Sequence, residues 1–250
     1  HREQMGGARR IIILKPRRIG VTVAEMMKWL TFMLCRARTN IAVASDDRQS
    51  AEVIAEEILG PIVETLKVEQ GELLTYMGVK VELIKRQLTV QHPQGKSTLY
   101  IGGLKDETFA LGIDLVGAHK TEAAYVTEMG KKTWQNLTNA VPSWGFETVE
   151  STAEGVGNDF YVDYFENKDH GPRKTVFLAW HVRETAKVEA GRAEIPAEIR
   201  GNFKLRPFEV EMQARFGLTL EQFRFYRLRE LLDGVKVKQY YPWNDMEAFI

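Results

Sequence analysis

The sequence predicts an α/β protein whose mainly parallel β-sheet is sandwiched between helices. Short apolar segments of the buried-strand type alternate with longer amphipathic segments, which is the pattern of a parallel sheet covered on both faces. With 250 residues and 44% hydrophobic composition, the chain is long enough to bury a sizeable core. No apolar run approaches the roughly 20 residues that span a bilayer. We therefore expect a soluble globular protein.

Two strand–helix units open the chain. Ile11–Leu14 is a continuous apolar run typical of a buried strand, and a helix is expected over Val21–Ala37. Ile41–Ala44 is the second expected strand. The cluster Ser45-Asp46-Asp47 then starts a helix over Gln49–Leu66, so the second unit repeats the first.

The middle of the chain combines a β-rich insertion with further strand–helix units. Alternating short apolar segments predict the insertion between residues 79 and 102, with a turn at Pro93. Buried strands and helices then alternate again. The expected strands are Val79–Ile84, Gln87–Gln91, Thr98–Ile101, Ile113–Ala118, Glu147–Ser151 and Thr175–Trp180, and the expected helices are Lys131–Ala140 and Asn158–Asn167.

A polar stretch punctuated by proline and glycine, His181–Gly201, separates this sheet from a helical tail. Helices are expected there over Pro207–Phe216 and Leu220–Leu232. We therefore expect a core domain over residues 1–185 and a small helical lid or linker subdomain over residues 186–250.

Charge and cysteine usage narrow the function classes. The 34 basic and 34 acidic side chains cancel, which argues against a standalone high-affinity nucleic-acid binder. Local basic residues such as Lys131 and Lys132 stay as candidates for DNA contact. Most of the tryptophans Trp134, Trp144, Trp180 and Trp243 are expected to pack in the core rather than to stack on bases. The single cysteine, Cys35, lies in an apolar segment and is expected to be a small core residue.

The first strand leads directly into a candidate phosphate-binding loop. In the usual Walker A loop, two glycines shape the turn, a lysine follows the second glycine, and a Ser or Thr hydroxyl binds Mg²⁺. Gly20 and Thr22 occupy the expected places, but Val21 stands where the lysine is usual and Lys15 where the first glycine is usual. The loop consists of Lys15, Pro16, Arg17, Arg18, Ile19, Gly20, Val21 and Thr22.

The chemistry of ATP binding fits these residues. Lys15 has a long stem that could bring its ammonium group to the β- and γ-phosphates, and the free N–H groups of the following helix favour an anion. Either Arg17 or Arg18 could contact the γ-phosphate, and Thr22 could bind Mg²⁺. The alternative is a solvent-exposed basic turn.

A second candidate lies after the apolar stretch Ile113–Ala118. A carboxylate at the end of a strand beside a phosphate loop can orient the attacking water and take its proton, which makes Glu122 the candidate general base. The aspartate that usually precedes it as a Mg²⁺ ligand is replaced by Thr121, whose hydroxyl contributes less charge. The alternative makes Glu122 the first acid of a short helix.

Together these segments resemble the large terminase family of tailed phages. The loop matches the form K-x-R-x-x-G-x-T/S, and the acidic segment matches H-x-S-E-x-A-x-W, with Val126 at the aromatic position. The resemblance runs through nearly the whole chain in the same order. The matching segments are Lys15–Thr22, His119–Ala124, Glu150–Phe160, Phe177–Trp180, Leu220–Tyr226, Gln239–Pro242 and Glu247–Ile250.

The resemblance implies a P-loop NTPase fold of the ASCE/RecA-like class and an ATPase motor that moves double-stranded DNA into a procapsid. It implies ATP and Mg²⁺ as cofactors, and the portal protein and the small terminase subunit as partners. It also implies a homo-oligomeric ring on the capsid, with a possible monomer in isolation, acting in the host cell cytoplasm. Ser151 and Thr152 lie in the family's coupling segment and would sense the γ-phosphate; alternatively they only begin the turn before the helix at Asn158.

Three departures from the usual ATPase site or from the family pattern stand out. Thr121 puts metal coordination in doubt, and Tyr240 stands where glutamate is frequent, so that position carries no catalytic role. The upstream adenine-contacting segment has no counterpart in His1–Gly7, and Gln4 is too near the strand, so we expect a trimmed N-terminus.

The family's nuclease domain is expected to be absent after Ile250, which predicts ATPase activity without DNA cleavage.

Two rival functions stay open. One is another nucleic-acid-stimulated P-loop ATPase, such as a helicase-like remodeller, which would need a second RecA-like domain. The other is a nucleotide-binding adaptor for ring assembly that no longer hydrolyses ATP, an idea that Val21 and Thr121 keep open.

Overall fold

The computed structural model describes residues 8–189 and 195–250, and their contacts form two compact units. The sheet unit comprises residues 8–14, 20–151 and 157–176. The helical unit comprises the described residues of 177–250 together with two short loops, Lys15–Ile19 and Thr152–Val156. His1–Gly7, including Gln4, lies outside the described residues. No helix in the described part of the chain is long and apolar enough to cross a membrane.

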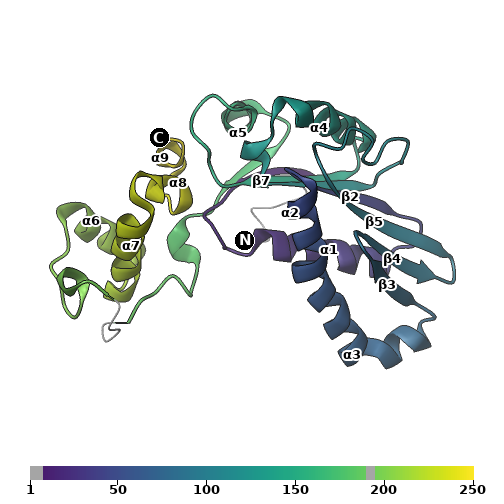
Figure 1. Cartoon of the computed structure of the whole chain (residues 1–250), viewed down its shortest axis with the longest axis horizontal. Coiled ribbons are helices and arrows are strands. Elements are labelled where there is room, and N and C mark those ends of the chain that lie inside the picture. Colours follow the sequence, from purple (N-terminus) through teal and green to yellow (C-terminus); the bar gives the residue numbers. More distant parts are fainter. Residues whose placement is uncertain (1–7, 190–194) are drawn as a thin grey trace. The chain divides into compact units, whose positions relative to one another are not determined.

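The sheet unit is built on an eight-stranded sheet, as counted over the described residues (Figure 1). Its strand order is β3-β4-β5-β2-β6-β7-β1-β8. The four pairs from β5 through β2, β6 and β7 to β1 are parallel, which confirms the predicted mainly parallel sheet. The strands are β1 (Arg10–Leu14), β2 (Asn40–Ser45), β3 (Lys80–Ile84), β4 (Gln87–His92), β5 (Gly95–Gly103), β6 (Gly117–Thr121), β7 (Phe146–Ser151) and β8 (Lys174–Phe177).

The predicted β-rich insertion is continuous with the main sheet. Strand β5 pairs in parallel with β2 and antiparallel with β4, and β4 pairs antiparallel with β3. The insertion therefore forms one edge of the sheet and does not make a layer of its own.

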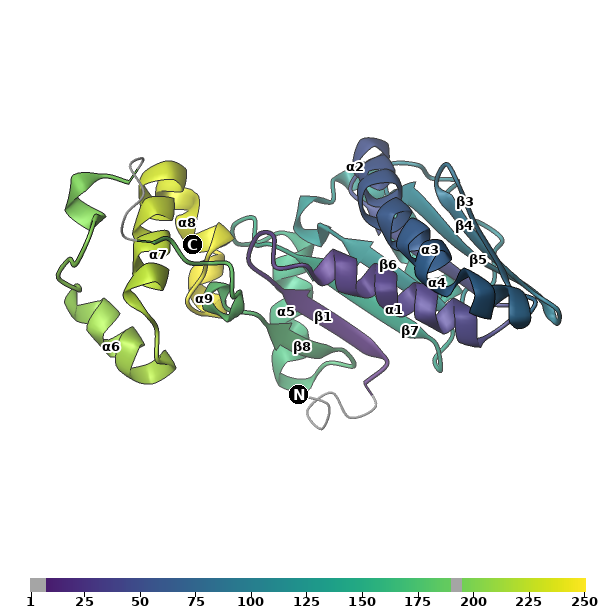
Figure 2. The same cartoon turned by 90° about the horizontal axis from the view of Figure 1, so that it is seen from below.

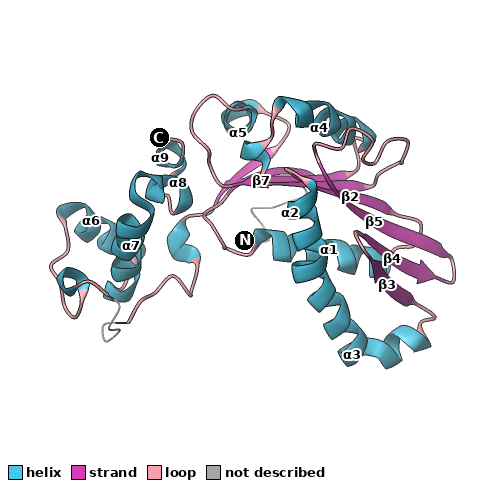
Figure 3. Cartoon of the chain, viewed as in Figure 1, coloured by secondary structure: helices cyan, strands magenta, loops and turns pink. Residues whose placement is uncertain are grey.

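Helices cover both faces of this sheet (Figures 1 and 3). On one face lie α1 (Val21–Cys35), α2 (Arg48–Val53), a π-helix (Ile54–Leu59) and α3 (Gly60–Tyr76); Figure 2 shows α1, α2 and α3 in front of the strands. On the other face lie α4 (Glu128–Ala140) and α5 (Asp159–His170).

Strand β2 illustrates how one segment feeds two cores. Its side chains alternate between the faces, so Ile41 and Val43 enter the core under α1 and α3, whereas Ala42 and Ala44 enter the core under α4. All four are fully buried. This double burial explains why the strand reads as a continuous apolar run.

Three expectations from the sequence are wrong in detail. The strand expected at Ile113–Ala118 is β6, Gly117–Thr121, because Leu115 lies in a loop that packs into the core under α4. The last strand ends at Phe177, and Trp180 opens a short 3₁₀-helix. Cys35 is exposed because it is the last residue of α1 and its side chain lies outside the core.

The helical unit is organised around Trp180, which is 1% exposed. Its ring lies 5.3 Å from that of Tyr226 and 5.1 Å from that of Trp243. Core packing is thus confirmed for Trp180 and Trp243, whereas Trp144, in the sheet unit, is exposed. The helices are α6 (Pro207–Phe216), α7 (Leu220–Asp233), α8 (Val237–Tyr240) and α9 (Asp245–Ala248).

Candidate nucleotide-binding site

The carboxyl ends of β6, β7 and β1 meet at one edge of the sheet. These strands are neighbours and run in parallel, with Thr121 opposite Glu150 and Leu14 opposite Ser151. In open α/β sheets, ligands bind beside this edge. The segments predicted to bind and hydrolyse ATP all leave the sheet here, because each directly follows one of these strands.

The start of α1 has the backbone geometry that an anion site requires. Gly20 precedes the helix with φ of 86°, in the left-handed region, and Arg18 also has a positive φ of 55°. A side chain at Gly20 would meet no atom within 4 Å, so the backbone there is open to a ligand. The first N–H groups of a helix carry no partner within the helix and favour an anion.

The loop Lys15–Ile19 belongs to the helical unit by its contacts. The backbone N–H of Arg17 donates to the carbonyl oxygen of Tyr240 over 3.0 Å, and the Arg17 guanidinium lies 3.8 Å from the centre of the Tyr240 ring. Lys15 and Pro16 are buried, whereas Arg17 and Arg18 are exposed. Tyr240, at the position where the family often has glutamate, therefore anchors the loop.

Thr22, in the first turn of α1, contacts a buried acid of the sheet. Its hydroxyl donates a hydrogen bond of 2.9 Å to Oε1 of Glu150, the penultimate residue of β7. The same oxygen lies 3.4 Å from Nε2 of His119 in β6, and both side chains are fully buried. Sequence reasoning placed Glu150 in the coupling segment and missed this contact; its signal was a carboxylate inside a buried strand.

Glu122 follows β6 immediately and has an unusual backbone. Its φ of 54° and ψ of 43° are left-handed, a conformation that is costly for a residue with a side chain and that clusters at functional sites. A 3₁₀-helix, Ala123–Tyr125, comes next, and the Ser151 hydroxyl accepts a hydrogen bond of 3.1 Å from the backbone N–H of Ala124. Ser151 thus holds the turn that carries Glu122.

The opposite face of the same two strands holds a network of buried ions. Glu147 of β7 accepts from Lys120 of β6 over 2.8 Å and from two nitrogens of Arg173 over 2.9 and 3.0 Å. Arg173 also donates to Asp163 over 2.9 Å. Burial alone would raise the pKa of Glu147, but the charges of Lys120 and Arg173 hold that pKa at about 2. Burial lowers the pKa of Lys120 to about 8, although the negative charge of Glu147 acts to raise that pKa.

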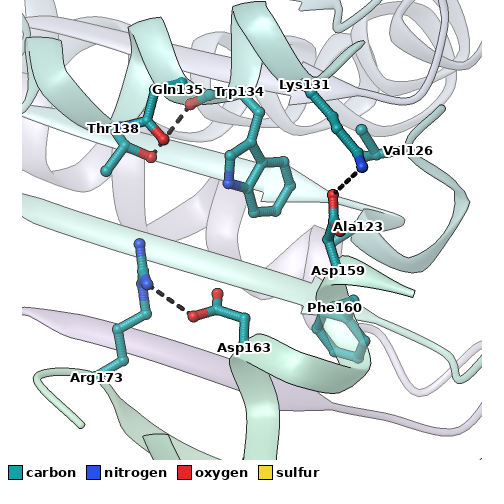
Figure 4. A pocket seen from close by; sticks show the side chains of 10 residues that line it. All are labelled: Ala123, Val126, Lys131, Trp134, Gln135, Thr138, Asp159, Phe160, Asp163 and Arg173. Atoms are coloured by element: carbon teal, nitrogen blue, oxygen red, sulfur yellow. Dashed lines mark hydrogen bonds and ion pairs between the residues drawn. The ribbon is translucent and has the colours of Figure 1, made fainter. Parts of the chain in front are cut away.

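A pocket of about 440 Å³ lies on this face between α4 and α5. Figure 4 shows Arg173 pointing toward Asp163 and Lys131 toward Asp159 in its wall. Lys131 lies 2.6 Å from Glu128 and 3.1 Å from Asp159, and Lys132 lies 2.7 Å from Glu107. Both lysines lie on α4, each beside acidic partners, so a DNA contact for them stays a prediction.

The donor set at the sheet edge suits a metal that arrives with phosphate. The described residues contain no cluster of three or more His, Cys, Asp or Glu side chains arranged to hold an ion. Thr22 and Glu150 nevertheless bring a hydroxyl and a carboxylate together, and Mg²⁺ typically takes one or two protein oxygens, with phosphate and water completing its shell. The residues present therefore fit a Mg²⁺–nucleotide complex.

The structure brings Thr22, Thr121, Glu122 and Ser151 to one edge of the sheet unit. It groups Thr152 with the helical unit, as it does the loop from Lys15 to Ile19. The mainly parallel sheet, the helices on both of its faces and the glycine turn before α1 make a three-layer α/β fold.

Comparison with solved structures identifies proteins that have a similar fold. The chain is similar to the large terminase ATPase domain of Thermus phage P74-26, with 16% identity and a TM-score of 0.64 over 97% of this chain and 89% of that one. It is also similar to the large terminase of a thermophilic bacteriophage in complex with ATP-γ-S, with 16% identity and a TM-score of 0.58 over 96% of this chain and 49% of that one. The HK97 bacteriophage large terminase matches at 14% identity, with a TM-score of 0.55 over 90% of this chain and 46% of that one.

The chain thus has the fold of phage large terminase ATPase domains, which confirms the fold that the sequence resemblance implied. It spans about half the length of the large terminases of the thermophilic bacteriophage and of HK97. No protein-family model matches the sequence, and no curated protein does.

Proposed function

We propose that this chain is the ATP-hydrolysing motor domain of a phage large terminase, which drives double-stranded DNA into a procapsid. The observation that carries the proposal is the hydrogen bond from Thr22 to the buried carboxylate of Glu150, at the sheet edge where the left-handed Glu122 follows β6. The fold of large terminase ATPase domains supports it, and the large terminase of the thermophilic bacteriophage was solved with ADP and with ATP-γ-S.

The first part of the proposal concerns binding. The N–H groups at the start of α1 and the loop Lys15–Val21 hold the phosphates, with Lys15 supplying positive charge. Thr22 would hold Mg²⁺, and Thr121 would contact it through water. When bound, this ion neutralises negative charge on the phosphate oxygens.

The second part concerns chemistry. Glu122 orients the attacking water and accepts its proton, and Arg17 or Arg18 stabilises charge on the γ-phosphate. The strained backbone of Glu122 supports this role, because such strain persists only where the surrounding structure enforces it. The hydrogen bond from Ala124 to Ser151 supplies that enforcement.

The third part concerns coupling. The loops that follow β1 and β7, Lys15–Ile19 and Thr152–Val156, both belong to the helical unit by their contacts. A phosphate bound by the first loop would therefore act on the helical unit directly, through the contact of Arg17 with Tyr240. Ser151 and Thr152 would sense loss of the γ-phosphate at the end of β7.

The partners follow from the motor function. They are double-stranded DNA held without sequence preference, the portal protein and the small terminase subunit, with further copies of the chain forming a ring in the host cytoplasm. A motor that moves along any sequence contacts phosphates rather than bases.

A non-hydrolysing adaptor is the second candidate, and two substitutions favour it. Val21 stands at the usual lysine position and Thr121 at the usual aspartate position, so the site lacks charged groups at two standard positions. Such an adaptor would bind ATP and use it only to assemble the ring.

Phosphate release with and without double-stranded DNA separates these functions. We expect ATPase activity in the wild type, and a loss of about 10²–10⁴-fold in kcat for Glu122→Gln, because that is the usual contribution of a general base. Lys15→Ala should weaken ATP binding as well. The matched control is Glu128→Gln, which removes an exposed acid on α4 and should leave kcat unchanged.

Two results would overturn parts of the proposal. Full activity in Glu122→Gln would remove Glu122 from the chemistry. ATP binding without hydrolysis, under any DNA condition, would favour the adaptor.

A further inference from the structure

The acid that usually binds Mg²⁺ is missing from the end of β6, and a buried acid lies in register with that position on the neighbouring strand β7. Thr121 of β6 occupies the position at which an acid normally binds Mg²⁺. Glu150 of β7 is its partner in the parallel register. Side chains in register on neighbouring strands lie on the same face of a sheet, so both face the side covered by α1. Their exposures are 2% and 0%.

The contact of Thr22 identifies which of the two strands supplies the acid. Thr22 is the residue whose hydroxyl binds Mg²⁺ in phosphate loops, and here it donates to Glu150 over 2.9 Å. Burying a carboxylate is costly unless polar or charged groups compensate it. A fully buried acid that contacts the metal-binding hydroxyl is therefore placed for a function and not for packing alone.

We infer that Glu150 supplies the carboxylate that holds the Mg²⁺ of the bound nucleoside triphosphate, in place of the acid absent at Thr121. The inference rests on the proposed function, and it assigns a carboxylate ligand for Mg²⁺, which the sequence pattern did not provide. The carboxylate acts on the ion directly or through a bound water, together with the Thr22 hydroxyl. The ligand is a Mg²⁺–nucleotide complex and not the free cation, because these two protein groups leave most of the coordination shell to phosphate and water.

His119 lies beside this carboxylate. Its Nε2 lies 3.4 Å from the same Glu150 oxygen that Thr22 contacts, and it is fully buried in the adjacent strand. Partners of this kind orient ligating groups, and their loss typically costs about 10–100-fold in metal affinity or activity. His119 is thus placed beside Glu150, which is the group that meets the metal complex.

The test measures ATP-γ-S affinity by calorimetry in Mg²⁺ and in EDTA, which requires no turnover. In the wild type we expect Mg²⁺ to tighten binding. In Glu150→Gln, which keeps the shape and an acceptor for Thr22, we expect the ratio of the two affinities to fall by about 10–100-fold, with binding in EDTA nearly unchanged. Glu150→Asp is a second, milder variant that keeps the charge. We expect the ratio of its affinities in Mg²⁺ and in EDTA to fall less than in Glu150→Gln.

A relocated acid provides the decisive control. Adding Thr121→Asp to Glu150→Gln returns a carboxylate to the neighbouring strand on the same face, and we expect it to restore most of the Mg²⁺ dependence. A purely structural role for Glu150 predicts equal losses in Mg²⁺ and in EDTA and no rescue, which would overturn the inference. An unchanged ratio in both Glu150 variants would overturn it as well. If the wild type binds no ATP-γ-S under either condition, the proposed function fails and the inference with it.

Discussion

Strands β6 and β7 each carry buried charged or polar residues toward both faces of the sheet. The partners of these residues differ between the two faces. Toward α4 and α5, Glu147 is bound by Lys120 and Arg173 within the sheet unit. Toward α1, Glu150 is contacted by the Thr22 hydroxyl, in the first turn of α1, and by the His119 imidazole of β6. Two glutamates three positions apart in one strand, Glu147 and Glu150, thus have different kinds of partner.

The partners of a buried acid indicate whether it stabilises the fold or can bind a ligand. A carboxylate held by two cations is fixed by its network, and removing it breaks the network. A carboxylate that contacts a hydroxyl beside an anion-binding helix start can take part in ligand binding. We therefore expect the α4/α5 face to control stability and the α1 face to control nucleotide binding.

The largest effect is expected on the structural face. Glu147→Gln leaves the buried ammonium of Lys120 without its carboxylate, which typically costs about 3–5 kcal/mol. We expect a decrease of about that size in the free energy of unfolding, measured by urea denaturation at pH 7. The double variant Lys120→Met with Glu147→Gln should recover part of the loss, because no unpaired buried charge then remains at Lys120. A loss below about 1 kcal/mol in Glu147→Gln would contradict the structural role.

The same acid predicts a pH dependence. The pKa of Glu147 is about 2 in the folded chain, below its ordinary value of 4.5. Its stabilisation is therefore fully present above about pH 4.5 and is lost as the pH falls toward 2, with a total of about 3 kcal/mol. Urea denaturation between pH 7 and pH 3 should show a steeper loss in the wild type than in Glu147→Gln. Equal slopes would show that Glu147 is not held in its charged form.

The smallest effect is expected at Glu122. Its left-handed backbone disfavours any residue with a Cβ atom, so Glu122→Gly should be about 1 kcal/mol more stable than Glu122→Ala. Both variants lack the carboxylate, and both should lose ATPase activity. Thermal denaturation compares them directly, and greater stability of the alanine variant would argue that this backbone is unstrained.

Much of the sheet could be predicted from the sequence because its strands are buried on both faces. Ile11–Leu14 and Ile41–Ala44 are continuous apolar runs, and both are strands within one residue at each end. The position of β6 could not be predicted. Leu115 made the preceding segment look like a strand, but it lies in a loop and packs into the core from there, whereas β6 itself carries the polar residues His119, Lys120 and Thr121. Polar residues in a buried strand are compensated by partners distant in sequence, which no local pattern reveals.

The candidate site divides in the same way. The loop around Gly20 and Thr22 was predictable because a strand, a glycine turn and a helix start follow one another in the chain. The hydrogen bond between Thr22 and Glu150 was not, because it joins residues 128 positions apart and depends on the order of β6, β7 and β1 in the sheet. The binding, catalytic and coupling roles of all the predicted site residues, including Lys15, Thr22, Glu122 and Thr152, stay predictions.

The most direct test of the central claim is a crystal structure of the chain with ATP-γ-S and Mg²⁺. We expect the triphosphate at the start of α1, the metal about 2.1 Å from the Thr22 hydroxyl, and the Glu122 carboxylate facing the terminal phosphate. A nucleotide bound elsewhere, or a start of α1 filled by packed side chains with the nucleotide excluded, would contradict the account.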